Sequence, residues 1–289
     1  MMKLLITGIS GFLGFNLYSN MSNKFEIIGT HSKNILKIKN WCSVKLDLTN
    51  ESDIQKLFNH YNPDLVIHAA AITKLNDCDQ NPTLTNQVNV NSTKILAKLC
   101  GLNNRRFIFI STDLVFDGKS SGLYSETDAT NPINLYAKSK VTSENFLLNM
   151  QDLDYTIMRM PLMFGDGGPY GKSSSYDLIE KLKKGENYSL FTNEFRTPLT
   201  GHEAAKAISY LLNCPEKIIH IGGPEKINRF DLGKMICNKF NFNINLLKPT
   251  SYHGTPLAQS RPENTSFNIS LAQKYDYNPP SLLEQLNHF

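Results

Sequence analysis

Short hydrophobic runs alternate with amphipathic stretches through the first half of the chain. The runs are rich in Ile, Leu, Val and Phe, and turn-forming residues bound them, as is typical of buried strands. The stretches between them repeat apolar residues three and four positions apart, as helices do. We expect strands at Lys3–Thr7, Phe25–Thr30, Val44–Leu46, Leu65–Ala69, Phe107–Ser111 and Tyr155–Arg159, and helices ending near Met21 and covering about 52–61, 85–102 and 133–149. This alternation predicts an α/β fold with a doubly wound parallel sheet, the Rossmann arrangement.

The pattern changes after Pro161. Residues 164–175 are rich in glycine and serine and predict a loop. Helices are expected near 175–184, 202–213 and Arg229–Phe240, and the apolar run 217–221 reads as a late strand. We therefore expect a cofactor-binding Rossmann domain over 1–164, to which 201–221 return, and a smaller C-terminal substrate-binding lobe over 165–200 and 222–289.

Composition narrows the function classes. The chain has 289 residues and a net charge of +4, without any long basic block, which does not favour nucleic-acid binding. Five scattered cysteines form no C-x-x-C pair, which argues against a zinc site and a disulfide framework. The apolar N-terminus meets a Thr-Gly turn at once, and no apolar run approaches the length of a membrane span. We expect a cytoplasmic protein without metal or membrane attachment.

A glycine-rich turn follows the first expected strand. The segment Thr7-Gly8-Ile9-Ser10-Gly11-Phe12-Leu13-Gly14 has the pattern G-x-x-G-x-x-G between a strand and a helix. Such glycines permit a tight turn, close approach of the backbone to a pyrophosphate, and packing of the helix on the sheet. The free N–H groups of the helix N-terminus then face the phosphates. The turn predicts a dinucleotide site.

The residues after the second strand bear on which dinucleotide is bound. NAD-binding proteins usually place a carboxylate there, whereas this chain has Thr30-His31-Ser32-Lys33. Hydroxyls, an imidazole and an ammonium suit a 2′-phosphate, so NADP(H) is favoured over NAD, although the segment could also be a solvated loop. Two further segments are expected beside the cofactor: Asp47-Leu48 at the adenine, and Ala69-Ala70-Ala71 where small side chains let the dinucleotide lie close.

Tyr136 and Lys140 form a Y-x-x-x-K motif on an expected helix. A spacing of four places both side chains on one helix face. An ammonium near a phenol favours the phenolate, so Lys140 is expected to lower the pKa of Tyr136, and it can also hold the nicotinamide ribose. Thr112 lies at the end of the fifth strand, at the sheet edge where such folds bind ligands, and its hydroxyl can meet a substrate carbonyl.

With these motifs in order, the chain resembles the extended short-chain dehydrogenases, and among them the dTDP-4-dehydrorhamnose reductases. The resemblance covers almost the whole chain and includes Gly8–Gly14, His68–Ala71, Val88–Val90, Ser111–Gly118, Tyr136–Lys140, Arg159 with Phe164-Gly165, and Arg261–Asn264. The run Ser-Thr-Asp-x-Val-Phe-Asp-Gly is its most specific part.

This resemblance implies reduction of a 4-keto-6-deoxyhexose carried on UDP or dTDP. Tyr136 would donate the proton, Lys140 would hold the ribose, and Thr112 with Asp113 would meet the substrate. Arg196 and Arg261 are candidates for the diphosphate, or alternatively for an ordinary ion pair between the two parts of the chain. A homodimer is possible.

A second resemblance is to the bifunctional UDP-4-keto-6-deoxyglucose 3,5-epimerase/4-reductases of UDP-rhamnose synthesis. Those proteins carry a cysteine after the fourth strand and a lysine before the second lobe, which match Cys78 and Lys181 here. A cysteine near a helix start can have a lowered pKa and exchange protons beside a ketone, but Cys78 could also be a small buried residue. Two other classes stay open: a cofactor-binding regulatory module resembling the regulatory subunit of methionine adenosyltransferase, and a nucleotide-sugar 4-epimerase.

Overall fold

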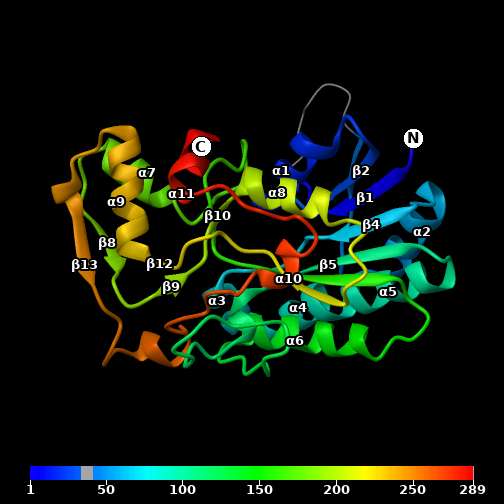
Figure 1. Ribbon diagram of the computed structural model, residues 1–289. Helices are drawn as coiled ribbons and strands as arrows, with labels where there is room; N and C mark the ends of the chain where they lie inside the picture. Colours follow the sequence, from blue (N-terminus) through cyan, green and yellow to red (C-terminus); the bar gives the residue numbers. More distant parts are fainter. Residues whose placement is uncertain (34–41, 289) are drawn as a thin grey trace.

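A computed structural model describes residues 1–33 and 42–288. Its centre is a seven-stranded sheet in the order β11-β6-β5-β4-β1-β2-β3, and every neighbouring pair is parallel. The strands are β1 (Lys3–Thr7), β2 (Glu26–His31), β3 (Cys42–Lys45), β4 (Leu65–His68), β5 (Arg106–Thr112), β6 (Tyr155–Met160) and β11 (Ile218–His220). The order reverses between β1 and β4, and this confirms the predicted doubly wound sheet (Figure 1).

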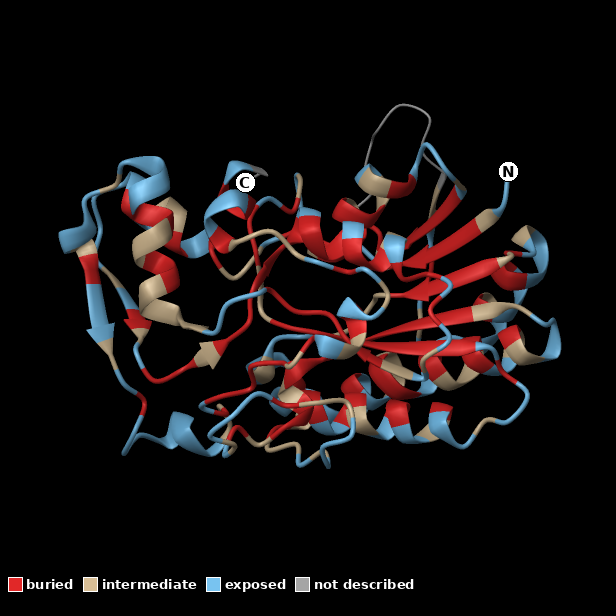
Figure 2. Ribbon diagram, viewed as in Figure 1, coloured by how far each residue is buried: buried red, intermediate tan, exposed pale blue. Residues whose placement is uncertain are grey.

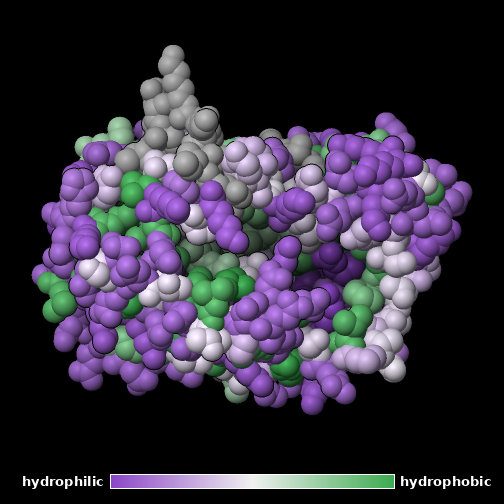
Figure 3. Space-filling view, turned by 180° about the vertical axis from the view of Figure 1, so that it is seen from behind, coloured by the Kyte–Doolittle hydropathy of each residue, from purple (hydrophilic) through white to green (hydrophobic). Residues whose placement is uncertain are grey.

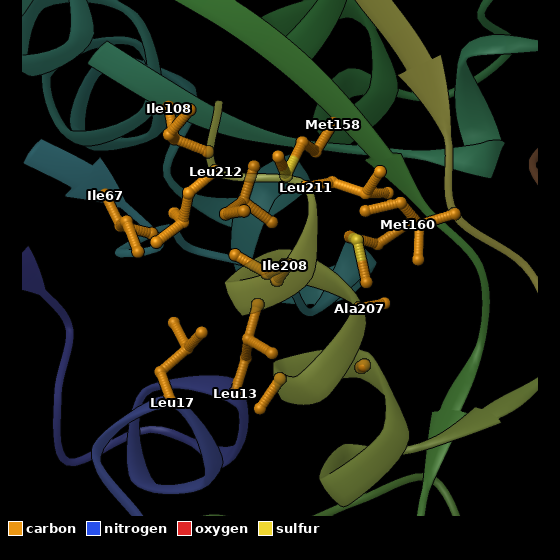
Figure 4. Close-up of a cluster of buried hydrophobic side chains, with 14 of the residues drawn as sticks. Leu13, Leu17, Ile67, Ile108, Met158, Met160, Ala207, Ile208, Leu211 and Leu212 are labelled. Atoms are coloured by element: carbon orange, nitrogen blue, oxygen red, sulfur yellow. The ribbon is translucent and has the colours of Figure 1, made fainter. Parts of the chain in front are cut away.

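Helices cover both faces of this sheet. One face carries α1 (Phe12–Met21) and α8 (Gly201–Tyr210), and the other carries α2 (Glu51–Tyr61), α5 (Ser92–Leu102) and α6 (Leu135–Leu148). Leu13, Leu17, Ile208 and Leu211 meet the sheet residues Ile67, Ile108, Met158 and Met160 in one apolar cluster (Figure 4). All four residues of β4 are buried, as expected of a strand that is covered on both faces.

Local sequence signals explain where the helices start and stop. Asn50, Asn134, Thr200 and Asn228 accept hydrogen bonds from the third residue into α2, α6, α8 and the lobe helix α9 (Arg229–Phe240). Helices α2 and α9 end at asparagines in the left-handed conformation, as C-terminal caps often do. The expected helix 85–102 is interrupted. It contains α4 (Pro82–Thr85), a π-helical segment over Asn86–Asn91, and then α5.

The C-terminal part of the chain builds a lobe with its own apolar cluster. Its main elements are α7 (Tyr176–Lys183), β8 (Tyr188–Phe191), α9 and β13 (Leu247–Thr250), and they pack around Leu182, Leu190, Ile236 and Leu247. Shorter elements before residue 165 are α3 (Leu75–Gln80), a 3-10 helix at Asp113–Val115 and β7 (Met163–Phe164). Those after it are β9 (Phe195–Arg196), β10 (Leu199–Thr200), β12 (Ile227–Asn228), α10 (Ser270–Gln273), α11 (Leu282–Gln285) and 3-10 helices at Ile244–Leu246, Pro256–Gln259 and Leu286–His288.

The burial pattern separates two packed regions. Buried residues concentrate in the sheet with its helices and, separately, on the inner sides of α9 and β8 (Figure 2). From behind, the surface is mostly hydrophilic and is hollowed between the part with the sheet and the lobe (Figure 3). Among the described residues, no helix is long and apolar enough to cross a membrane, and no group of metal-ligating side chains gathers.

Candidate active site

The glycine turn between β1 and α1 has room for backbone only. Gly8 has a φ of +72°, and a Cβ on it would lie 2.8 Å from the Cα of Ala70. A Cβ on Gly14 would lie 2.3 Å from the carbonyl oxygen of Gly8. Gly11 caps α1 without any side-chain hydrogen bond, and the first turn holds no acidic residue. A helix start with this character is suited to an anion such as a pyrophosphate.

The other residues of this turn differ in how far their side chains are exposed. Leu13 is buried in the apolar cluster, so only its backbone can face a ligand, whereas Ser10 and Phe12 are half-buried. The predicted loop 164–175 packs on the same helix. The side-chain amide of Asn16 donates to the carbonyl of Asp166 at 2.9 Å, and a Cβ on Gly171 would lie 2.6 Å from the Cα of Phe12. The loop therefore lies close to the start of α1.

The segment Thr30–Lys33 at the end of β2 contains no carboxylate, and its polar side chains differ in burial. His31 is buried, its Nδ1 is hydrogen-bonded to the Ser43 hydroxyl at 2.5 Å, and its Nε2 is buried without a partner. Burial and the charge of Lys45 lower the pKa of His31, so this ring is neutral at pH 7. Ser32 and Lys33 are exposed. An exposed ammonium beside a hydroxyl is a suitable pair for a 2′-phosphate.

Two more predicted segments border this region. Asp47 is exposed, and its carboxylate accepts hydrogen bonds from the amide and hydroxyl of Thr49, which lower its pKa, while Leu48 is half-buried against the core. Residues Ala69, Ala70 and Ala71 are half-buried after β4. The amide of Ala70 donates to the hydroxyl of Thr7 at 3.1 Å, which fixes this small-residue segment beside Gly8.

Thr112 and Tyr136 meet at the carboxyl edge of the sheet. Thr112 ends β5 and Tyr136 lies in the first turn of α6, which Asn134 caps. Both residues are buried, and the Thr112 hydroxyl lies close enough to the phenol to influence the pKa of Tyr136. The proton of the Thr112 hydroxyl is donated to Asp113 at 3.1 Å. The structure thus brings together two hydroxyl groups that could meet one carbonyl oxygen.

Lys140 lies on the same face of α6 but is directed into the protein. Its Nζ donates to the carbonyl of Ile110 at 2.8 Å and lies 4.6 Å from the centroid of the Phe109 ring. Burial lowers the pKa of Lys140 to about 8, and the nearby Glu144 carboxylate opposes this shift.

The prediction that Lys140 lowers the pKa of Tyr136 is wrong for this structure. Burial, followed by the charges of Asp113 and Cys78, raises the pKa of the phenol, and the neighbouring Thr112 hydroxyl offsets this only in part. Spacing placed the two side chains on one helix face correctly, but it carried no information about desolvation. Tyr136 is therefore a neutral phenol at pH 7, which is the form that can donate a proton.

The two residues proposed for epimerisation are placed differently. Cys78 of α3 is fully buried near Tyr136, and its thiol donates to the carbonyl of Ile72 at 3.4 Å. Its pKa is raised, mainly by burial, so the expected lowering of a cysteine pKa near a helix start does not occur. Lys181 is exposed on α7, 5.7 Å from the ring centroid of Tyr188 in the lobe, and the structure does not bring it to Tyr136.

Asp113 and Arg196 form a buried ion pair beside Thr112. The Arg196 Nε lies 3.0 Å from the Asp113 carboxylate, which also accepts from the Thr265 hydroxyl at 2.7 Å. Burial raises the pKa of Asp113, although Arg196 opposes the shift. Asp113 thus joins β5 to the C-terminal segment. Its carboxylate is occupied by protein groups.

Arg261 lines a cavity of about 670 Å³, and Glu194 connects Arg261 to Arg196. The cavity lies between the segment after β5 and the C-terminal segment, and its walls include Asp117, Lys119, Ser120, Ile133, Phe195, Lys226, Tyr252, His253, Arg261, Glu263 and Asn264. A cavity of this size with several polar groups is typical of a site for a small organic ligand.

Sequence reasoning missed two buried carboxylates. Glu144 follows Lys140 by four residues on the same face of α6, and it pairs with Arg159 at 2.8 Å. Glu194 lies between Arg196 and Arg261, at 3.6 and 3.3 Å. The i+4 spacing was a usable signal for Glu144, whereas Glu194 had no local signal because one of its arginines is 67 residues away.

Comparison with known proteins gives a consistent result. The model of the family described as RmlD substrate binding domain matches residues 2–289. A dTDP-4-dehydrorhamnose reductase of Aggregatibacter actinomycetemcomitans is 25% identical over 95% of this chain and 93% of its own length. The methionine adenosyltransferase 2 subunit beta of Danio rerio is also 25% identical, over 93% of this chain and 83% of its own length.

A solved structure agrees with these sequence matches. The crystal structure of a dTDP-4-dehydrorhamnose reductase from Bacillus anthracis str. Ames, in complex with NADP, superposes with a TM-score of 0.86 and 25% identity, and the match covers 100% of this chain and 99% of that one.

Proposed function

Because this chain belongs to the RmlD substrate-binding domain family, we propose that it is an NADPH-dependent oxidoreductase that reduces the 4-keto group of a nucleotide-linked 4-keto-6-deoxyhexose. One observation carries the proposal: the hydroxyls of Thr112 and Tyr136 meet at the same sheet edge as the Gly8–Gly14 turn. A dinucleotide and a carbonyl substrate would meet at that edge.

The cofactor assignment follows from the fit of the chain to a dinucleotide. The turn at Gly8, Gly11 and Gly14 would hold the pyrophosphate, and Ser32 with Lys33 would meet a 2′-phosphate. The NADP in the similar Bacillus anthracis structure supports this choice over NAD. When bound, NADPH supplies the hydride for carbonyl reduction.

The residues of this chain supply the proton and the orientation. Tyr136 is a neutral phenol because burial raises its pKa, so it can donate a proton to the carbonyl oxygen as that oxygen gains charge. Thr112 holds the same oxygen in line with the phenol. Lys140, fixed by the carbonyl of Ile110, would hold the ribose. Proton transfer between positioned groups in a site with little water is an efficient arrangement.

We propose that the two parts of the chain bind different ligands, as expected from the sequence. Residues 1–164 with 201–221 would hold the dinucleotide, and residues 165–200 with 222–289 would hold the sugar nucleotide. The cavity beside Arg261 supports this division because its walls come from both parts of the chain.

A coupled assay tests the proposal. Purified protein would receive NADPH with either UDP-4-keto-6-deoxyglucose or dTDP-4-keto-6-deoxyglucose, with and without a separate 3,5-epimerase. Absorbance at 340 nm reports oxidation of NADPH, and NMR identifies the sugar. Formation of a rhamnose nucleotide without the added epimerase would make Cys78 the residue to test for proton exchange. Oxidation only after its addition would define a simple reductase, and the preferred nucleotide names the substrate.

A second function is favoured by one finding, the similarity to methionine adenosyltransferase 2 subunit beta. Under this alternative the chain binds NADPH as a regulatory module and catalyses no reaction. Binding of NADPH without reduction of either keto sugar, together with co-elution with a methionine adenosyltransferase, would support it over the reductase.

A further inference from the structure

Glu194 is a buried carboxylate placed between two arginines. Its Oε1 lies 3.6 Å from the Arg196 Nη2, and its Oε2 lies 3.3 Å from the Arg261 Nη1. The Glu194 side chain is 7% exposed. The three residues come from β9, the residue before it, and the C-terminal segment, so the cluster forms only when the lobe folds.

The two arginines are not equivalent. Arg196 is 4% exposed, and its three nitrogens contact Asp113 at 3.0 Å and the backbone carbonyls of Phe195, Pro262 and Glu263 at 2.6, 3.0 and 3.2 Å. A ligand could reach it only by displacing several of these partners.

Arg261 is far less constrained. Its side chain is 37% exposed and lines the cavity. The carboxylate of Glu194 is its hydrogen-bond acceptor, and the guanidinium also lies 5.4 Å from the centroid of the Phe191 ring. Its Nε is buried without a partner. This guanidinium can therefore exchange its acceptor for one supplied by a ligand.

The charges around Glu194 leave an excess of one positive charge. Arg229 is a third arginine in the cluster; its backbone amide donates to the carbonyl of Glu194 at 3.1 Å, and its charge interacts with the Glu194 carboxylate. Three arginines thus face two carboxylates, Glu194 and Asp113. A diphosphate brings at least two negative charges, so it would be attracted by the arginines and repelled by Glu194 at short range.

We propose that Glu194 is an internal counter-anion of Arg261, which the diphosphate of the substrate replaces on binding, while Arg196 only positions Glu194 and Asp113 and does not contact the ligand. The proposal rests on the proposed function, because it takes the nucleoside diphosphate of a sugar nucleotide as the ligand. It assigns different roles to Arg196 and Arg261, which were both candidates for the diphosphate on the sequence alone.

The sign of one mutational effect distinguishes this role from a structural one. Glu194→Gln keeps the size of the side chain but removes the competing charge, so a nucleoside diphosphate should bind more tightly, by roughly two- to fivefold for a partly exposed ion pair. Simple structural damage to the cluster would weaken binding instead.

The test is calorimetric titration of UDP and of dTDP into the full chain. Wild type, Glu194→Gln, Arg261→Met and the double variant would be compared, with Glu180→Gln as the control, because Glu180 forms an exposed ion pair with Lys183 on α7. We expect Glu194→Gln to tighten binding only while Arg261 is present, Arg261→Met to weaken it by about tenfold or more, and Glu180→Gln to change nothing.

Three outcomes would overturn the proposal: no gain or a loss of affinity in Glu194→Gln, the same gain in the Arg261→Met background, or unchanged affinity in Arg261→Met. If Glu194→Gln fails to fold, the affinity of Arg261→Met still decides the proposal. Failure of the proposed function is read separately, because absence of NADPH oxidation in the wild type refutes the reductase while the binding titrations still decide the role of Glu194.

Discussion

Replacement of Glu144 by glutamine would remove the carboxylate that pairs directly with Arg159 in the interior of the protein. Arg159 on β6 donates to both carboxylate oxygens of Glu144, at 3.2 and 2.8 Å, and the side chains are 3% and 2% exposed. Ser111 donates to the same carboxylate. His220, at 3.3 Å, cannot balance a cation in either protonation state, and it is neutral because burial, followed by the charge of Arg159, lowers its pKa to about 3. The charge of Arg159 also interacts with the Glu126 carboxylate, which accepts from the backbone amide of His220 at 2.8 Å.

We expect Glu144→Gln to lower the free energy of unfolding by a large amount for the change of one functional group. Glu144→Gln preserves volume and part of the hydrogen bonding, so the loss comes mainly from a buried cation without its directly paired carboxylate. Breaking a buried ion pair in this way typically costs about 3–5 kcal/mol of the free energy of unfolding. The control is Glu180→Gln, whose exposed pair with Lys183 should contribute at most about 0.5 kcal/mol.

Urea unfolding followed by far-UV circular dichroism measures both values. A double variant, Glu144→Gln with Arg159→Met, removes the cation as well and should recover a large part of the loss. If Glu144→Gln were within about 1 kcal/mol of the wild type, the interior would have another way to compensate Arg159, and the argument from burial would be wrong. A double variant no more stable than the single one would also refute it.

Three further predictions concern the proposed site. Tyr136→Phe should lower kcat at least about 100-fold while NADPH affinity, measured by fluorescence titration, changes little; a rate above a few per cent of wild type would remove Tyr136 as proton donor. Gly14→Ala should abolish NADPH binding, because its Cβ would lie 2.3 Å from the Gly8 oxygen. The control Gly101→Ala, whose Cβ would have no neighbour closer than 3.6 Å, should bind NADPH normally. Equal NADPH affinities of the two variants would contradict the assignment of the turn. Lys140 is an ammonium below its pKa of about 8, so kcat should be full below that pH and fall above it; a profile flat to pH 10 would refute a requirement for the charge.

Much of the architecture could be predicted because its causes are local. Hydrophobic periodicity gave the strands and helices of the sheet region, and asparagine or threonine caps mark the helix starts. The glycine turn could be recognised because its pattern reflects the space available at Gly8 and Gly14. The spacing of Tyr136 and Lys140 placed both on one helix face, and the order of strands brought Thr112 to the same edge.

The chemistry of individual groups required the tertiary structure. Lys140 donates to Ile110 on β5, so it does not lower the pKa of Tyr136 as the motif alone implied, and burial raises that pKa instead. The same desolvation raises the pKa of Cys78. Whether Arg196 and Arg261 are free or paired depends on Asp113 and Glu194, which reach them from other segments. By itself the sequence determined the sheet, the turn and the side chains on one helix face, because these follow from neighbours along the chain. Only the folded protein decided charge state and partner, because both depend on which distant groups exclude water from a side chain.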